Sequence, residues 1–179
     1  EAFSERGANV ALISGPVNLI TPKNVNRINV ISAQEMWQAS LESAVKNQIF
    51  IGCAAVADYR VAEVADQKIK KSGDEISIKL IKNPDIISDV GHLKTHRPFT
   101  VGFAAETQNV DDYAKDKLER KNLDMICAND VSGGQVFNAD ENALQLFWKD
   151  GHKKLSLKSK VELAADLVNE IIELYQKTL

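Results

Sequence analysis

The stretch IFIGCAAVADYRVAEVADQKIKK, residues 49–71, constrains the fold of this chain most. Its first five residues, Ile49 to Cys53, form a short apolar run that predicts a fully buried β-strand. Small alanines follow, and then come the acid Asp58 and a cationic cluster at positions 68, 70 and 71. In an open α/β sheet, ligands bind beyond the carboxyl ends of the strands. The stretch therefore predicts a ligand site where this strand ends.

Strand and helix patterns alternate along the rest of the chain. Strands are predicted over residues 9–14, 27–31, 75–81, 99–105 and 124–128, the third of them half-exposed in a hairpin or flap. A β-hairpin is predicted over 143–148 and 153–157, with Asp150-Gly151 as its tight turn. This order predicts an α/β fold with a mostly parallel sheet that is covered on both faces.

Four helices are marked by their first residues or by their charge. Ser32 with Glu35 and Ser159 with Glu162 have the spacing of capping boxes. Asn83 and Pro84 suit the cap and the first position of another helix. Residues 109–121 predict a further helix, which is rich in charged residues. The expected core-facing stripes are Met36, Trp37, Leu41, Ala44 and Val45 in the first helix, and Val161, Ala164, Val168, Ile171, Ile172 and Tyr175 in the last.

Length and composition indicate one domain, residues 1–179, with a sizeable core. The formal net charge of −3 argues against general affinity for nucleic acids. No apolar run is long enough to cross a membrane, and no signal peptide is visible. Cys53 and Cys127 lie in strand-like runs, where we expect buried, reduced thiols and therefore a cytoplasmic protein. The first residues, EAFSERGANVALIS, are typical of the last turn of a helix before a strand, so we expect the domain to be N-terminally incomplete.

Two groups of lysines could neutralise an anion. Lys117 and Lys121 are four residues apart on one predicted helix and could hold neighbouring phosphates, although a solvated charged face explains them as well. Lys68, with Lys70 and Lys71, follows the strand that ends in small residues.

Other candidates have structural alternatives. Asp58 could accept hydrogen bonds from a base or a ribose, or it could cap a local turn. Phe103 could pack on a nucleobase or belong to the core. Residues 83–87 offer helix N–H groups to an anion or a base edge, but simple capping accounts for the same residues.

Tyr113 and Lys117 have the Tyr-x-x-x-Lys spacing of short-chain dehydrogenases, which leaves an NAD(P)-dependent reductase as an alternative function. No Gly-x-Gly-x-x-Gly turn that would bind the nicotinamide cofactor is present. His92, His96 and His152 lack a nucleophile elbow, and no Cys/His cluster has the spacing of a zinc site. A third, non-enzymatic interpretation is a dimeric nucleotide-binding module.

The strings GCAAVADYR, KIKK, KNPDI, VGFAAET and KNLDMICAND, in this order, resemble the phosphopantothenoylcysteine synthetase family. The resemblance covers most of the chain. It implies a Rossmann-like three-layer fold, a homodimer and, in many bacteria, fusion to an FMN-dependent decarboxylase half that this chain lacks. The family's first strand, glycine-rich first turn, important asparagine and phosphopantothenate contacts are not seen in this sequence.

The resemblance also implies a reaction and a set of site residues. The carboxylate of 4′-phosphopantothenate would attack the α-phosphate of CTP, and L-cysteine would then displace CMP from the acyl-cytidylate, with Mg²⁺ and lysines neutralising the triphosphate. Lys68 would be the catalytic residue, stabilising charge at the reacting phosphate. The implied nucleotide contacts are Gly52, Cys53, Ala54, Asp58, Lys68, Pro84, Asp85, Ile86, Ile87, Phe103, Lys117 and Lys121.

Overall fold

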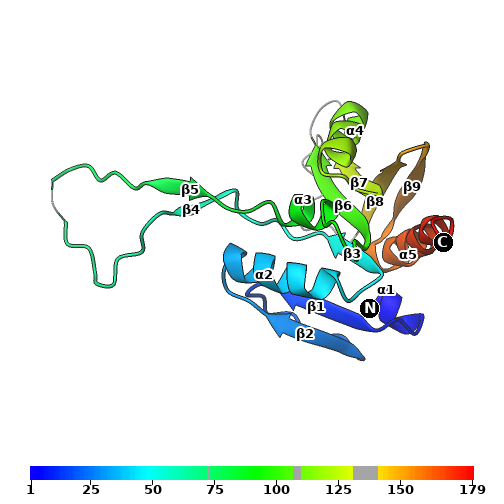
Figure 1. Ribbon diagram of the computed structural model, residues 1–179, viewed down its shortest axis with the longest axis horizontal. Coiled ribbons are helices and arrows are strands. Elements are labelled where there is room, and N and C mark those ends of the chain that lie inside the picture. The colour runs from blue at the N-terminus through cyan, green and yellow to red at the C-terminus, as the bar shows by residue number, and fades with distance from the viewer. Residues whose placement is uncertain (72, 107–109, 131–140) are drawn as a thin grey trace.

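A computed structural model describes residues 1–71, 73–106, 110–130 and 141–179 of the chain (Figure 1). The largest sheet has the strand order β3-β6-β7-β8-β9. The bounds of these strands are β3 Ile49–Gly52, β6 Phe99–Glu106, β7 Met125–Asp130, β8 Glu141–Trp148 and β9 Gly151–Ser159. β3, β6 and β7 pair in parallel, and β8 and β9 complete the sheet as an antiparallel hairpin.

Helices cover both faces of this sheet, as the sequence predicted. α5 (Lys160–Gln176) packs on one face, where Phe99, Val101 and Cys127 point from the strands toward Leu163 and Ile171 of the helix. α3 (Ile86–Gly91) and α4 (Val110–Arg120) lie on the other face, where alternate strand residues form a second apolar cluster. The three-layer α/β fold is therefore confirmed, and its core lies in two halves on either side of the sheet.

The N-terminal part forms a separate two-stranded sheet. β1 (Val10–Ser14) and β2 (Val25–Asn29) pair in parallel, and α2 (Ala33–Ala44) packs against β1. The short α1 (Ala2–Glu5) lies against α5 (Figure 1). We expected one mostly parallel sheet, whereas the described residues form three sheets that share no hydrogen-bonded strands, and the third is the pair of strands at residues 59–61 and 80–82.

A long arm extends away from the rest of the molecule (Figure 1). Its described residues are 59–71 and 73–82, and its base is the antiparallel pair β4 (Tyr59–Val61) and β5 (Leu80–Lys82). The predicted strand over 75–81 is therefore mostly wrong. Beyond the bond from the Ala62 N–H to the carbonyl of Lys79, the two sides of the arm diverge, and residues 75–78 are exposed and belong to no strand.

The helix caps differ in detail from the prediction. Ser159 and Glu162 form a complete capping box, as expected, and its hydrogen bonds lower the pKa of the Glu162 carboxyl. Ser32 caps α2 as predicted, but Glu35 reaches back to the N–H of Ile31 instead of the N–H of the cap. The predicted cap Asn83 is wrong, because α3 begins two residues later with Asp85 as its N-cap.

The predicted apolar stripes were partly wrong. Val161 is 77% exposed, because it lies in the first turn of α5 and points away from the sheet. Leu163 and Leu167, which the predicted stripe omitted, are buried instead. Val45 is exposed because it is the C-cap of α2, beyond the part of the helix that packs. Asn109, the predicted start of the charged helix over residues 109–121, lies outside the described residues.

Three expectations about strands also need correction. β3 is only half-buried, because it is an edge strand of the five-stranded sheet. Cys53 comes after the end of this strand and is exposed, whereas Cys127 is buried in β7 and this burial raises the pKa of its thiol. The hairpin turn is Lys149-Asp150, since Gly151 already pairs with Trp148. Among the described residues, none of the helices has both the length and the apolar character needed to cross a membrane.

Candidate functional site

Two glycines lie opposite each other, Gly52 at the carboxyl end of β3 and Gly102 in the middle of β6. Gly52 pairs with Gly102 in the parallel register. A Cβ atom at Gly52 would lie 2.7 Å from Cδ1 of Ile87, and a Cβ atom at Gly102 would lie 3.2 Å from the same atom. The absence of side chains on both strands therefore lets α3 approach the sheet closely. Its first turn is thereby placed at the carboxyl edge, where a ligand site was predicted.

Asp85 is the N-cap of α3 and accepts hydrogen bonds from two elements. Its Oδ1 accepts from the N–H of Ser88 at 3.2 Å. Lys121, which directly follows α4, places its Nζ 3.0 Å from Oδ2 of Asp85 and 3.2 Å from Oδ1. Both side chains remain partly exposed, at 37% for Asp85 and 20% for Lys121. The structure thus brings together two predicted site residues that are 36 positions apart in sequence.

Lys117 lies one helical turn before Lys121 and is half-buried. The carbonyl of Lys117 accepts the N–H of Lys121 at 3.0 Å, so the helical backbone continues through both lysines. The predicted shared face at the end of α4 is consistent with this arrangement. The ion pair of Lys121 with Asp85 therefore joins the end of α4 to the start of α3, and Lys117 lies one turn earlier on α4.

Cys53, Ala54 and Asp58 belong to the loop that follows β3, and all three residues are exposed. The backbone carbonyl of Asp58 accepts the N–H of Asn83 at 2.8 Å, which anchors the end of this loop beside the residues that lead into α3. Pro84, Ile86 and Ile87 are half-buried there. The loop after β3 and the start of α3 are thus neighbours.

Two predicted site residues lie apart from this group. Phe103 is partly buried on the opposite face of the sheet, against the cluster that α5 covers. Lys68 is exposed on the arm, which extends away from the sheet (Figure 1). The structure does not bring either residue to the region between α3 and α4. Tyr113 of α4, the tyrosine of the alternative reductase, is exposed.

Within the described ranges, no group of three or more His, Cys, Asp or Glu side chains is arranged to hold a metal ion. The charged groups of the site are instead well suited to a phosphate-containing ligand, because lysine ammonium groups bind phosphate oxygens as point charges. Asn83 and Arg60 also belong to this region, although the sequence had suggested for Asn83 only a helix cap or a contact from the helix start to an anion or a base edge. Their hydrogen bonds join segments that are far apart in sequence, and no local pattern indicates them.

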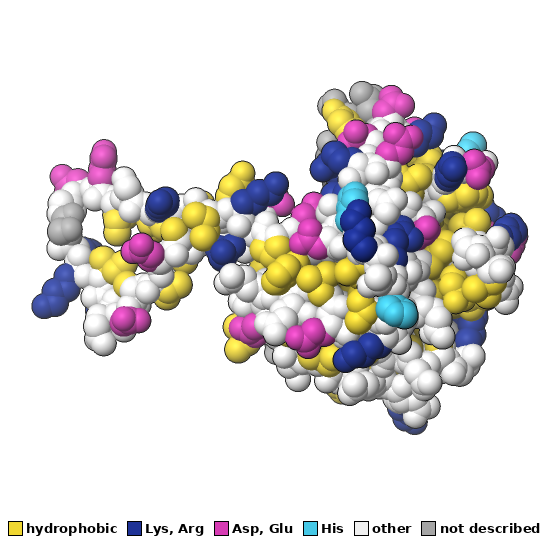
Figure 2. Space-filling view, viewed as in Figure 1, with side chains coloured by type: hydrophobic (Ala, Val, Ile, Leu, Met, Phe, Trp, Pro, Cys, Tyr) yellow, Lys and Arg dark blue, Asp and Glu magenta, His cyan; other side chains and the backbone are white. Residues whose placement is uncertain are grey.

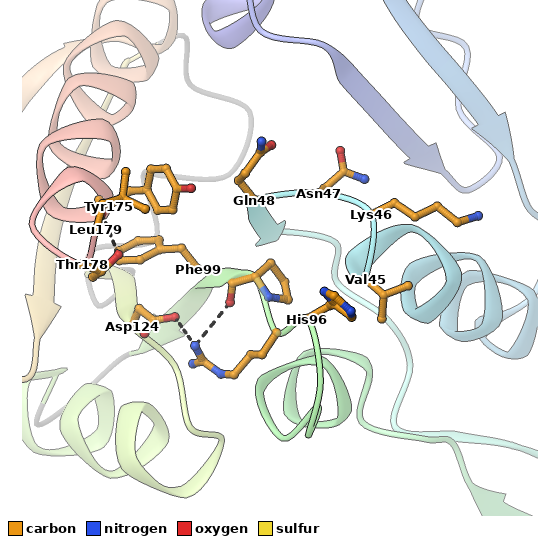
Figure 3. Close-up of a pocket in the computed structure, with 12 residues that line it drawn as sticks. Val45, Lys46, Asn47, Gln48, His96, Phe99, Asp124, Tyr175, Thr178 and Leu179 are labelled. Atoms are coloured by element: carbon orange, nitrogen blue, oxygen red, sulfur yellow. Dashed lines mark hydrogen bonds and ion pairs between the residues drawn. The ribbon is translucent and has the colours of Figure 1, made fainter.

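A cavity of about 480 Å³ lies at the amino ends of β3 and β6 in the five-stranded sheet (Figure 3). Its walls come from residues 45–48 before β3, residues 96–99 at the start of β6, and the C-terminal segment with Tyr175. Arg97 holds this edge together by an ion pair with Asp124 at 2.8 Å and by hydrogen bonds to backbone carbonyls. No sequence pattern indicated this cavity, and none of its lining residues is a predicted site residue.

The fold and the site define a three-layer α/β protein with a lysine–carboxylate pair at the start of α3. A family model described as "DNA/pantothenate metabolism flavoprotein C-terminal domain" matches residues 1–175. The chain belongs to this family.

Curated relatives agree with this assignment. The chain is 95% identical to the "Coenzyme A biosynthesis bifunctional protein CoaBC" of Haemophilus influenzae over 179 residues, which are 100% of this chain and 45% of that protein. The protein of the same name from Escherichia coli K12 is 57% identical over 180 residues, covering 98% of this chain and 44% of the relative. The chain thus spans less than half the length of these relatives.

Solved structures share the fold. The crystal structure of the C-terminal domain of a CoaBC protein superposes with a TM-score of 0.82 and 34% identity, over 99% of this chain and 80% of that one. A more distant structure, a Cab2 mutant in complex with phosphopantothenate-cysteine, has a TM-score of 0.65 and 14% identity, over 87% of this chain and 54% of that one. At this lower identity the likeness concerns the fold alone. The comparisons give no support to the alternative reductase.

Proposed function

We propose that this chain is the synthetase part of a CTP-dependent ligase, which joins 4′-phosphopantothenate and L-cysteine in coenzyme A biosynthesis. The observation that carries the proposal is the 95% identity, along the whole chain, to a protein named for coenzyme A biosynthesis. The phosphopantothenate-cysteine complex of the distant structural neighbour is consistent with this product.

The proposed reaction has two steps. A carboxylate oxygen of 4′-phosphopantothenate attacks the α-phosphorus of CTP, and pyrophosphate leaves with the electron pair of the broken P–O bond. The amine of cysteine then attacks the acyl carbon, loses a proton, and expels CMP as the amide forms. Both steps need positioned cations and a site that excludes water, because the mixed anhydride would otherwise hydrolyse.

The residues at the carboxyl edge would hold the nucleotide. Lys117 and Lys121 would bind the triphosphate, and Asp85 would keep Lys121 in place until the phosphates arrive. The remaining proposed contacts are Gly52, Cys53, Ala54 and Asp58 after β3, Pro84, Ile86 and Ile87 at α3, and Phe103. Mg²⁺ would enter as part of the substrate, bound to the phosphate oxygens of CTP, as is usual for this ion.

Lys68 would act as the catalytic residue from the arm. Because the arm extends from the body, Lys68 would reach a reacting phosphate through movement of the arm or by entering the site of a second copy. Its ammonium group would stabilise the charge that develops on the α-phosphate.

We further propose a homodimer in which the arms of two copies make contact. The arm exposes a series of large apolar side chains, which Figure 2 shows interspersed with charged ones and which would gain stability by being covered. These residues are Tyr59, Val61, Val64, Ile69, Ile76, Ile78 and Leu80. In the complete protein we expect a fused decarboxylase half that binds FMN, and a cytoplasmic location, where CTP and cysteine are both supplied.

A pyrophosphate-release assay on the full-length protein tests the function. Pyrophosphate should appear only when CTP, 4′-phosphopantothenate and Mg²⁺ are all present, and amide product should form only when cysteine is added. Equal product formation without CTP would contradict the proposal. Nucleotide binding without turnover in the full-length protein would instead indicate a binding module.

Lys68→Gln tests the proposed catalytic residue in the same assay. Because the side chain is exposed, folding should be retained, while the rate of pyrophosphate release should fall about 10² to 10³-fold through loss of one charged transition-state contact. Lys79→Gln, which removes another exposed lysine of the arm, is the matched control and should keep the wild-type rate. An unchanged rate in Lys68→Gln would remove this residue from the mechanism.

A further inference from the structure

Asn83 is one of the few buried polar residues of the described structure, with only 7% of its surface exposed. Its side-chain Nδ2 donates to the carbonyl of Ala57 at 2.8 Å, and its Oδ1 accepts from Nη1 of Arg60 at 3.2 Å. Its backbone N–H donates to the carbonyl of Asp58 at 2.8 Å. All three hydrogen bonds therefore reach residues 57–60, which lie more than 20 positions earlier in the chain.

These bonds join three segments that the proposed function uses separately. Ala57 and Asp58 end the loop after β3, Arg60 lies in the base of the arm, and Asp85 caps α3 two residues after Asn83. Arg60 also donates to the carbonyl of Lys82 at 2.8 Å, so it closes the base of the arm from the other side. Asn83 and Arg60 together form a clamp where the loop, the arm and α3 meet.

Both polar ends of the Asn83 amide are satisfied, and each has a different partner. A buried amide with a paired donor and a paired acceptor fixes its neighbours more strictly than an apolar side chain of the same size. A shift at this position would move the loop relative to α3. It would also change the direction in which the arm leaves the body.

We propose that Asn83 is a positioning residue for nucleotide binding, acting with Arg60 and without touching the nucleotide itself. The inference rests on the proposed function, because it takes the loop after β3 and the start of α3 as the two sides of the CTP site. Displacement of positioned groups by about 1 Å can cost about 10²-fold in rate even when the changed residue is remote from the chemistry. Loss of the clamp would allow the loop after β3, the start of α3 and the arm to shift relative to one another, and so would displace both sides of the site.

The test compares Asn83→Ala, Arg60→Met and the double variant in the full-length protein, by steady-state kinetics with CTP and with cysteine. We expect the KM for CTP to rise about tenfold or more in Asn83→Ala, as for misplaced binding groups. The KM for cysteine should stay unchanged. Arg60→Met should give a smaller rise, since the bond from Asn83 to Ala57 remains. The double variant should show a smaller rise than the two single effects combined, because the two residues share the hydrogen bond between them.

Asn47→Ala is the matched control. Its side-chain Nδ2 also donates to a backbone carbonyl, that of Ser43 at 2.7 Å, but it lies before β3 at the other edge of the sheet. A purely structural role for Asn83 predicts that both variants lose stability while the KM for CTP stays at the wild-type value, and that result would overturn the proposal. If Asn83→Ala does not fold, Arg60→Met decides, and an unchanged KM for CTP in a folded Arg60→Met variant would be equally decisive.

Hydrogen exchange separates the clamp from the proposed function. If the wild-type protein releases no pyrophosphate from CTP, the proposed ligase function is wrong. The proposed role of Asn83 in nucleotide binding is then wrong as well. The clamp is then tested by the exchange rate of the backbone N–H of Asn83, which donates to the carbonyl of Asp58. Faster exchange of this amide in Arg60→Met supports a mechanical link between Arg60 and the loop, and unchanged exchange removes that link as well.

Discussion

The Asp85 carboxylate interacts with two groups at the same time. It caps α3 through the N–H of Ser88 and holds the ammonium group of Lys121. When a triphosphate binds, its oxygens would compete with Asp85 for Lys121, and the cap would keep the carboxylate in place. The ion pair therefore holds the side chain of Lys121 near the site in one defined position.

Lys121→Gln should weaken nucleotide binding with little effect on stability. The ion pair is partly exposed, so its loss should change the free energy of unfolding by no more than about 1 kcal/mol. The KM for CTP should rise about tenfold, because one charged contact to phosphate is lost. Arg120→Gln is the control, since Arg120 makes an exposed ion pair with Asp116 on the outer side of the same helix. Equal KM values for both variants would contradict the assigned role of Lys121.

At the residue scale, sequence reasoning found the lysines but not their partners. The spacing of Lys117 and Lys121 predicted a shared helix face, because that relation is local. The pairing of Lys121 with Asp85 depends on how α3 and α4 pack, which no local pattern records. Asn83 was misjudged for the same reason. Asn and Asp both cap helices well. The side chain of Asn83 is already hydrogen-bonded to Ala57 and Arg60, and Asp85 is the residue that caps α3.

Helix α3 has only the residues Ile86–Gly91, so its position depends on packing and not on its own stability. Ile87 supplies that packing by covering Gly52 and Gly102 on neighbouring strands. In addition, Trp37 of α2 donates from Nε1 to Oδ2 of Asp89 at 2.7 Å, which fixes α3 from the other side. The start of α3 is therefore placed at the carboxyl edge by contacts on two sides.

Gly52→Ala should destabilise the protein through this contact. The new Cβ atom would lie 2.7 Å from Cδ1 of Ile87, and overpacking of this kind costs about 1–3 kcal/mol in the free energy of unfolding. Ile87→Val removes Cδ1, so the double variant Gly52→Ala/Ile87→Val should lose less than the sum of the two single variants. Denaturant unfolding of the four proteins measures this coupling. Simple additivity would show that Ile87 moves aside at no cost.

At the element scale, the sequence predicted which elements exist better than which faces they bury. The complete capping box placed α5 correctly, because a cap is encoded within four residues. Its buried face was partly wrong, since Leu163 and Leu167 pack on the sheet while Val161 does not. All of these residues are apolar, so the choice between adjacent faces depends on where β8 and β9 lie.

On the scale of the whole molecule, the arm is the segment least supported by the rest of the chain. Its apolar side chains are exposed in a single copy, and its two sides diverge beyond the β4–β5 base. The sequence predicted a hairpin or flap but could not give its extent, because strand pairing over residues 75–78 would need partners that a single copy does not provide.

The double variant Ile76→Asp/Ile78→Asp should convert the proposed dimer into monomers. The two side chains are 68% and 63% exposed in one copy, so the variant should fold normally while charges enter the contact between copies. Light scattering coupled to size-exclusion chromatography measures the mass, and circular dichroism checks the fold. Leu157→Asp, at an exposed position on β9, is the control. A dimer that survives the double variant would place the interface elsewhere.

The cavity lined by residues 45–48 and 96–99 has a consequence for inhibition. It is formed where β3 and β6 begin, whereas the ammonium group of Lys121 lies at the first turn of α3, which packs at the end of β3. A small molecule lodged in the cavity would leave the entry of nucleotide open. Excess CTP should therefore not rescue the enzyme from such a compound. Its effect would reach the chemistry through Arg97, whose Nε donates to the carbonyl of Gly91 at the end of α3 and whose Nη2 donates to the carbonyl of Asn122, next to Lys121.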